Sequence, residues 1–179
     1  MFDLDPFIAD CIAATRDPQP RLAIKELLAR AVAEPGAVTR ALPATRAEIE
    51  RLYVSPELTI LKVVWAPGMR IFPHDHRMWA AIGIYGGQED NTFYRRAPQG
   101  IVASGGRQLH ERDVALLGDD SIHAVVNPRP RFTGAIHVYG GDFFAEPRSE
   151  FDPDTLAEQP YDVERTLALF DAANVGRPA

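Results

Sequence analysis

Hydrophobic residues in the first third of the chain recur with a helical period. Apolar side chains share one face of a helix predicted over residues 2–14. The same spacing predicts a second helix over residues 22–32. Pro20 precedes this second helix, and Pro35 with Gly36 is expected to end it, because both residue types interrupt helical backbone. We expect these helices to pack against the rest of the fold.

Two further helices are expected, one on each side of the central region. Thr45 and Glu48 have the spacing of a capping box, which predicts a third short helix that runs through Leu52. A last helix is predicted over residues 163–173, where leucine and phenylalanine side chains recur. The proline-rich residues 146–160 before it are expected to be irregular.

From residue 59 onward the hydrophobic period shortens to two, which indicates strands. Glycine, proline and asparagine turns separate the strand-like runs, and many short strands with such turns are typical of a β-sandwich or barrel. One domain is therefore expected, with a helical extension (1–55), a β-barrel (56–145) and an irregular tail with a helix (146–179). The predicted strands are residues 59–65, 70–72, 80–85, 92–96, 108–110, 114–117, 124–126 and 133–139.

Composition narrows the class of protein. With 46% hydrophobic and 25% charged residues, the 179-residue chain is globular in character rather than disordered. A net charge of −6 argues against a nucleic-acid partner, which requires a basic surface. The single cysteine, Cys11, excludes an internal disulfide and any multi-cysteine metal site. The first residues are acidic and no apolar run is long enough for a bilayer, so we expect a soluble cytoplasmic protein.

Two histidines in the β region point to a metal. His74 and His76 are two residues apart, so on a strand their side chains leave the same face. Two imidazoles side by side on an inward face need partners for four nitrogens, and they repel each other when protonated. A shared metal ion removes both problems. An exposed His-x-His pair on the outside of the sheet is the alternative.

The residues around this pair, and a second motif, carry a family resemblance. Gly68 stands six residues before His74, and His123 is followed four residues later by Asn127. Together with His76, these positions resemble the two-motif signature of the cupin superfamily. That resemblance implies a metal site in an all-β core with the cupin double-stranded β-helix, or jelly-roll barrel. It also implies that the N-terminal helices pack outside and that a short C-terminal helix follows.

The chain departs from the usual cupin pattern at one ligand. Ala80 and Ala81 stand where most cupins have a metal-binding glutamate. The predicted ligands are therefore the three neutral imidazoles of His74, His76 and His123. Such a shell leaves open positions on one side of the ion, which suits Fe(II) with O2 and a chelating substrate. Zinc or nickel is the alternative, because imidazole alone does not select one metal.

A second pair of side chains follows on the last predicted strand. His137 and Tyr139 also share a face, and a neutral histidine there can orient the tyrosine hydroxyl. A buried aromatic strand with a satisfied histidine is the alternative. Residues 74–79 and 136–140 resemble the thiol dioxygenases, the cysteine dioxygenase family of cupins, most closely the bacterial branch with 3-mercaptopropionate dioxygenases. Ala135 departs from that family, which has a serine two residues before the histidine.

The same resemblance offers one candidate for the substrate's carboxylate. In the bacterial branch an arginine nine residues beyond the tyrosine has that role, and Arg148 is nine residues beyond Tyr139. The arginine that animal cysteine dioxygenases place before the barrel has no counterpart, since Ser55 occupies its position. The alternative for Arg148 is a solvated surface residue.

The expected function follows from this resemblance. It implies an Fe(II)-dependent dioxygenase that oxidises a small thiol, of the cysteine or 3-mercaptopropionate type, to its sulfinic acid with O2. One alternative is a three-histidine cupin that cleaves a C–C bond of a chelating dicarbonyl-type substrate. Another is a metal-bound cupin that binds or senses a small molecule without turnover. The expected partners are a small molecule and O2, with no nucleic acid or membrane, and the protein is expected to be a monomer or homodimer.

Five other residues are expected to have structural roles. His110 lies in a polar turn and is expected to be exposed. Asp75 lies between two predicted ligands and must point to the opposite face of the strand. Asn127 is expected to fix a turn, and Phe72 and Trp79 to belong to the barrel core or to a pocket wall.

Overall fold

Three helices open the chain in the computed structural model, which describes residues 1–98 and 100–176. Helices α1 (Leu4–Ala14) and α2 (Pro20–Val32) confirm the first two predicted helices. The third helix, α3 (Pro35–Ala41), begins where the sequence predicted only the end of α2, because proline is well tolerated in the first turn of a helix.

The predicted helix from residue 45 to residue 52 is wrong. Strand β1 (Glu48–Val54) occupies that segment and pairs in antiparallel fashion with β2 (Thr59–Trp65). The capping-box spacing is a local signal, and the hydrogen bonds offered by the edge of a neighbouring strand outweigh it.

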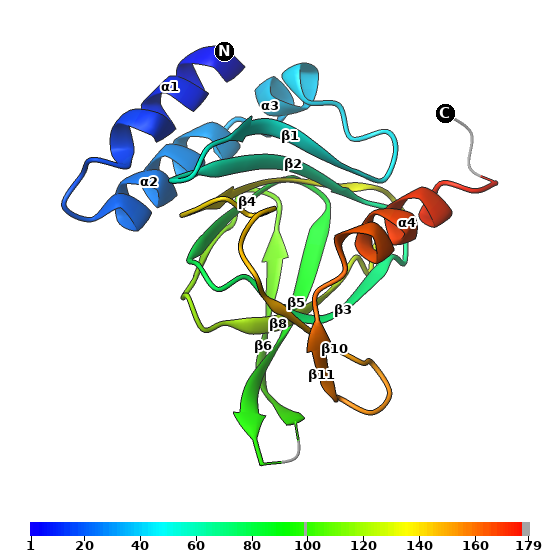
Figure 1. Cartoon of the computed structure of the whole chain (residues 1–179). Coiled ribbons are helices and arrows are strands. Elements are labelled where there is room, and N and C mark those ends of the chain that lie inside the picture. Colours follow the sequence, from blue (N-terminus) through cyan, green and yellow to red (C-terminus); the bar gives the residue numbers. More distant parts are fainter. Residues whose placement is uncertain (99, 177–179) are drawn as a thin grey trace.

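Two antiparallel sheets form the centre of the molecule (Figure 1). The strand orders are β1-β2-β9-β4-β7 and β11-β10-β3-β8-β5-β6. The main hydrophobic core contains side chains from both sheets, so it lies between them. This is the predicted double-stranded β-helix, with helices at the N-terminus and one short helix near the C-terminus. The remaining strands are β3 (Arg70–Asp75), β4 (Ala80–Gly86), β5 (Gln88–Ala97), β6 (Gly100–His110), β7 (Val114–Leu117), β8 (Ile122–Val126), β9 (Thr133–Tyr139), β10 (Ser149–Phe151) and β11 (Glu158–Pro160).

The structure corrects several strand boundaries. Strands β7 and β9 have the predicted bounds, but β5 and β6 are much longer than predicted and form a hairpin that projects from the barrel (Figure 1). Cross-strand pairing extends them through glycine and charged residues that carry little strand signal of their own. The segment predicted as irregular, residues 146–160, contains the short strands β10 and β11, which add to the edge of the six-stranded sheet.

Strands β2 and β9 are buried along their whole length because both of their faces are covered. Alternate residues of β9 point into the barrel core, while Ile136 and Val138 pack against the N-terminal helices. Gly83 on β4 permits the close approach of α2, since a Cβ there would lie 3.1 Å from Val32. The helical layer therefore backs the strand that carries the second pair of candidate residues.

Helix α4 (Val163–Ala173) packs against β1, near the C-terminal end of the chain (Figure 1). Asp162 caps it by accepting a hydrogen bond from the Arg165 backbone N–H at 3.0 Å. Asn174 binds the backbone of Ala47, which holds the end of the helix against the start of the sheet. Across the described ranges, no helix combines the length and the apolar character needed to cross a membrane.

Candidate metal centre

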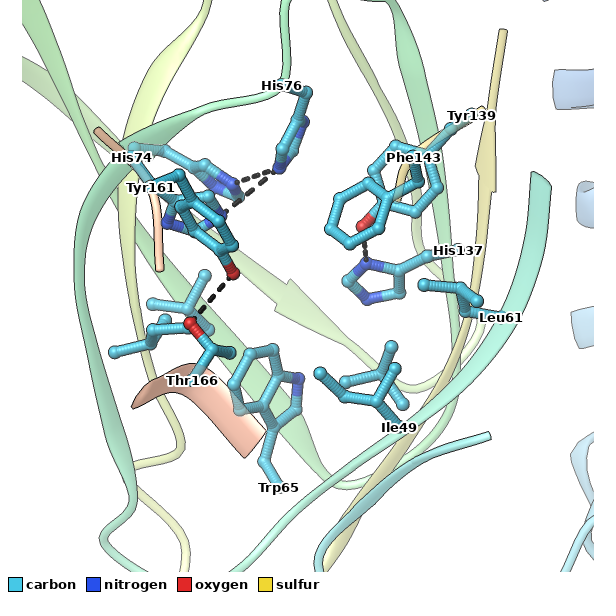
Figure 2. A pocket seen from close by; sticks show the side chains of 14 residues that line it. Ile49, Leu61, Trp65, His74, His76, His137, Tyr139, Phe143, Tyr161 and Thr166 are labelled. Atoms are coloured by element: carbon cyan, nitrogen blue, oxygen red, sulfur yellow. Dashed lines mark hydrogen bonds between the residues drawn. The ribbon is translucent and has the colours of Figure 1, made fainter. Parts of the chain in front are cut away.

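Three buried imidazoles converge at the end of the six-stranded sheet. His74 is the last residue but one of β3, and His76 follows directly after that strand. His123 lies opposite His74 on the neighbouring strand β8. The Nε2 atom of His76 lies 3.2 Å from the Nε2 atoms of both other histidines (Figure 2). The antiparallel pairing of β3 with β8 thus brings together residues that are 49 positions apart in the sequence.

The donor set fits one metal ion. His74 Nδ1 lies 3.0 Å from the Phe72 carbonyl and His123 Nδ1 lies 2.6 Å from Asn91 Oδ1, so both Nδ1 atoms donate and both Nε2 atoms present lone pairs. One proton on His76 Nε2 can satisfy only one of those lone pairs. Imidazole nitrogens bound to one ion at roughly 2.1 Å lie about 3.0 to 3.4 Å apart, which matches the observed spacing.

Burial keeps the three imidazoles neutral, the state that binds metals. It lowers the pKa of His74 to about 4 and lowers the pKa of His76 and of His123 well below the usual value. Neighbouring positive charge, including that of the other imidazoles, acts in the same direction. Among the residues that the structure describes, these three histidines form the whole candidate cluster, and no carboxylate joins it.

Alanine occupies both positions at which the resemblance to cupins would have placed a glutamate ligand. Ala80 belongs to the barrel core, and Ala81 faces the helical layer. Neither supplies a ligand atom, so the cluster is a three-imidazole site. Because neutral imidazoles carry no charge, a divalent ion held there would keep its formal charge of +2 to attract an anionic substrate. The identity of that ion is not fixed by imidazole ligands.

His137 and Tyr139 face the imidazole cluster from the other sheet, across a cavity (Figure 2). His137 Nδ1 lies 3.0 Å from the Tyr139 hydroxyl. The Tyr139 ring meets the His76 ring edge-on, with 5.0 Å between the ring centres. Burial raises the pKa of Tyr139 further above its usual value, so the hydroxyl stays protonated and available to donate.

The sequence prediction missed one buried carboxylate beside this pair. Glu89 on β5 is 0% exposed, accepts a hydrogen bond from Trp65 Nε1 at 2.8 Å, and lies 3.3 Å from His137 Nε2. It also accepts a hydrogen bond from Asn91 Nδ2 at 3.0 Å. The signal that was overlooked is the alternation of Glu89, Asn91 and Phe93, which places all three on the face of the strand that points toward the core.

The pKa of Glu89 lies below its usual value. Burial alone would raise it, but the donors of His137, Asn91 and Trp65 lower it by more. The side chain is therefore an ionised carboxylate that can only accept hydrogen bonds.

Arg148 is buried and does not itself line the cavity, but it contacts two side chains that do. Its guanidinium is stacked between the rings of Phe143 and Tyr161, 4.0 Å from each ring centre, and Nη1 donates to the Phe143 carbonyl. Nε and Nη2 are buried and have no hydrogen-bond partner in the described part of the chain. The charge of Arg148 also lowers the pKa of His74 and His76, which places it within electrostatic reach of the cluster.

The cavity between the two groups is lined mainly by apolar side chains and is narrow, with a volume of about 30 Å³. Tyr161 and Thr166, from the C-terminal segment, close one side of it and share a hydrogen bond of 2.9 Å between their hydroxyls (Figure 2). The apolar lining residues include Ile49, Leu61, Val63, Ile71, Val125 and Phe143.

The residues expected to have structural roles are placed as follows. His110 is exposed, as predicted. The side-chain amide of Asn127 donates to the carbonyls of Trp65, Ala66 and Arg131, so it joins two loops at the end of the barrel. Asp75 points away from the cluster and pairs with Arg77 and Arg96. Phe72 belongs to the barrel core, as predicted.

Trp79 corrects the last of these predictions in part. Its ring lies against Gly140, where an added Cβ would be only 2.1 Å away, and it packs with the helical layer outside the barrel. It therefore belongs neither to the pocket wall nor to the core between the sheets. Gly140 is required there because any side chain would collide with the indole.

No protein-family model matches the chain. Solved structures do resemble it. The BH2720 protein of Bacillus halodurans superposes with a TM-score of 0.51 at 14% identity, over 58% of this chain and 77% of that one. The chain has the cupin fold. Two other similar structures are an RmlC-like cupin family protein of Methanocaldococcus jannaschii and a cupin superfamily protein of Desulfitobacterium hafniense.

These two cupin structures are more distant in shape. The M. jannaschii protein is 12% identical, with a TM-score of 0.46 over 57% of this chain and 87% of its own. The D. hafniense protein is 16% identical, with a TM-score of 0.46 over 59% of this chain and 88% of its own. At such identities the similarity concerns the fold alone, and the chemistry of this protein has to be argued from its own site.

Proposed function

We propose that this cupin is an Fe(II)-dependent dioxygenase that oxidises a small anionic thiol to its sulfinic acid. The observation that carries the proposal is the cluster of three neutral imidazoles facing the His137–Tyr139 pair across one apolar cavity. The reaction adds both atoms of O2 to sulfur, so that R–SH and O2 give R–SO2H. His74, His76 and His123 would hold the iron, which would supply the site for a thiolate and O2 and would lower the pKa of the thiol through its charge.

Tyr139 is the proposed hydrogen-bond donor to the reacting atoms. The hydroxyl is protonated and buried, and its contact with His137 at 3.0 Å holds the oxygen at the edge of the cavity. When substrate is bound, the single O–H turns from His137 toward the reacting atoms, where a hydrogen-bond donor stabilises developing negative charge. The resemblance to thiol dioxygenases assigns the same two residue types to this role.

Arg148 is the proposed partner of the substrate's anionic group. A buried guanidinium with two unpartnered nitrogens, Nε and Nη2, carries a large desolvation cost, and a carboxylate would offset this cost by accepting a bidentate pair of hydrogen bonds. Its stacking between Phe143 and Tyr161 fixes the plane of the guanidinium beside the cavity. This arrangement favours a thiol that also carries a carboxylate.

Arg148 and Tyr139 also bear on the rival reaction, cleavage of a chelating dicarbonyl. A dicarbonyl binds a metal through its two oxygen atoms and needs neither a separate partner for an anionic group nor an oriented hydroxyl. In that reaction Arg148 and Tyr139 would therefore have no role. We therefore place thiol oxidation first.

The test uses the iron-loaded protein, prepared without oxygen. Cysteine, 3-mercaptopropionate, cysteamine and 2,4-pentanedione are added separately with O2, and oxygen uptake is measured while mass spectrometry follows the products. We expect uptake with a carboxylate-bearing thiol and a sulfinate heavier by two oxygen atoms. Metal-free protein is the control. Uptake with the diketone alone would transfer the proposal to C–C cleavage, and binding without uptake on any compound would leave a non-catalytic cupin.

A further inference from the structure

Glu89 connects the two sheets at the candidate site. It is carried by β5 of the six-stranded sheet, and its Oε2 atom meets Trp65 Nε1 and His137 Nε2, both from the five-stranded sheet. Its Oε1 atom accepts from Asn91, which in turn contacts His123. One fully buried carboxylate thus lies between the imidazole cluster and the His137–Tyr139 pair, in contact with residues that line the cavity but not lining it itself.

The contact with Asn91 determines which nitrogen of His123 carries the proton. Because an ionised carboxylate only accepts, Asn91 must direct its Nδ2 toward Glu89 and its Oδ1 toward His123. His123 Nδ1, 2.6 Å from that oxygen, must then donate. The Nε2 atom of His123 is left with the lone pair that a metal needs.

The contact between Glu89 and His137 also determines which nitrogen of His137 carries the proton. His137 Nε2 lies 3.3 Å from Glu89 Oε2, an ion-pair distance without hydrogen-bond geometry, and a carboxylate that can only accept favours a proton on this nitrogen. In the neutral imidazole, Nδ1 is then the acceptor, and it takes the Tyr139 O–H at 3.0 Å. Ala135 has no hydroxyl to do this, and no other carboxylate lies within ion-pair distance of His137 among the described residues.

We propose that Glu89 is a positioning residue that sets the tautomers of both His123 and His137. His123 then faces the cluster with an unprotonated Nε2, and in the substrate-free protein His137 accepts a hydrogen bond from the Tyr139 O–H at Nδ1. It contacts neither substrate nor metal and acts through Asn91 and His137. The proposal rests on the proposed function only in treating His123 as a ligand and Tyr139 as a donor, and it is tested without thiol or O2.

The main experiment compares the wild-type protein with Glu89→Gln. An amide has one accepting and one donating end, so it cannot accept from both Asn91 and His137. Long-range 1H–15N spectra of the metal-free, 15N-labelled full chain report the proton position on each imidazole. We expect at least one of His123 and His137 to change tautomer in Glu89→Gln. We also expect zinc affinity, measured by competition with a chelator, to fall by about tenfold, as for other partners of metal-binding histidines.

Two further variants separate this role from a general loss of packing. Trp65→Phe removes one hydrogen bond from Glu89 but leaves its carboxylate, so both tautomers and the zinc affinity should stay as in wild type. Asn91→Ala disconnects His123 only, so the His137 tautomer should be unchanged while zinc affinity falls. Because Asn91→Ala keeps the buried carboxylate, it tests half of the proposal even if Glu89→Gln does not fold.

The outcomes are distinct. Unchanged tautomers of both histidines in folded Glu89→Gln, with wild-type zinc affinity, would overturn the proposal. Equal losses in Trp65→Phe and Glu89→Gln would overturn it too, because they would show that packing alone is responsible. A wild-type protein that shows the expected tautomers and binds zinc, yet oxidises no thiol, would reject the proposed function and leave this inference standing.

Discussion

Two strands of this protein carry the same spacing of functional side chains, but the two pairs meet different partners. His74 and His76 at the end of β3, and His137 and Tyr139 on β9, are both pairs two residues apart that point into the barrel. Beside His74, the neighbouring strand offers His123, another imidazole. Beside His137, the neighbouring strands offer the apolar Leu61 and Ile82, and the polar partner comes from the opposite sheet.

The difference teaches that a two-residue spacing determines only which face a side chain leaves. The partner that each pair meets, on the neighbouring strand or on the opposite sheet, decides the chemistry, because another imidazole produces opposed lone pairs and a carboxylate orients a hydrogen-bond chain. The predictions below break one side of this comparison at a time.

The largest effect is expected from His123→Ala. It removes one of three ligand nitrogens, so iron or zinc affinity should fall by more than about 100-fold, a larger loss than that of an outer partner. Metal content after dialysis, measured by mass spectrometry, checks this. His110→Ala, which removes an exposed histidine, is the matched control and should bind metal like wild type. Equal metal content in the two variants would show that the cluster is not the site.

Tyr139→Phe tests the other pair. It removes one hydroxyl and keeps the ring against His76 and Phe143, so metal content should be unchanged while kcat for a carboxylate-bearing thiol falls by about 100-fold. Steady-state oxygen uptake measures this change. A loss of metal instead of kcat would place Tyr139 in the construction of the cluster.

Arg148→Gln is expected to act on substrate binding. KM for 3-mercaptopropionate should rise by about tenfold or more, since a buried charge–carboxylate pair is lost. 2-Mercaptoethanol, which has no anionic group, serves as the control substrate and should show no such rise. A similar change in KM for both thiols would mean that Arg148 maintains the shape of the cavity and does not bind an anion.

The smallest effect on the site is expected from Asp75→Asn. Asp75 stands between two candidate ligands but faces outward, where it pairs with Arg77 and Arg96 and accepts the Ser149 backbone N–H at 2.8 Å. The free energy of unfolding should fall by about 1 to 3 kcal/mol, as for other hydrogen bonds to charged groups, with metal affinity within about twofold of wild type. Chemical denaturation and dialysis measure the two quantities. A large loss of metal would contradict the separation of the two faces.

Much of the fold could be predicted from the sequence because its signals are local. The bounds of β9 follow from a continuous buried run between turns, and the first two helices from their apolar stripes. The segment from residue 48 to residue 54 could not be predicted in the same way. Its local spacing favours a helix, and only pairing with β2 makes it a strand.

The sequence by itself predicted the residues of the candidate cluster, since His74 and His76 are two residues apart in the β region and, with His123, carry the cupin spacing. It also determined the pair of His137 and Tyr139. Only the tertiary structure decided that Glu89 joins the two groups and that Arg148 is buried with two unused donors. The reason is physical: spacing along one strand fixes direction, whereas a hydrogen-bond partner from another sheet depends on how the sheets stack.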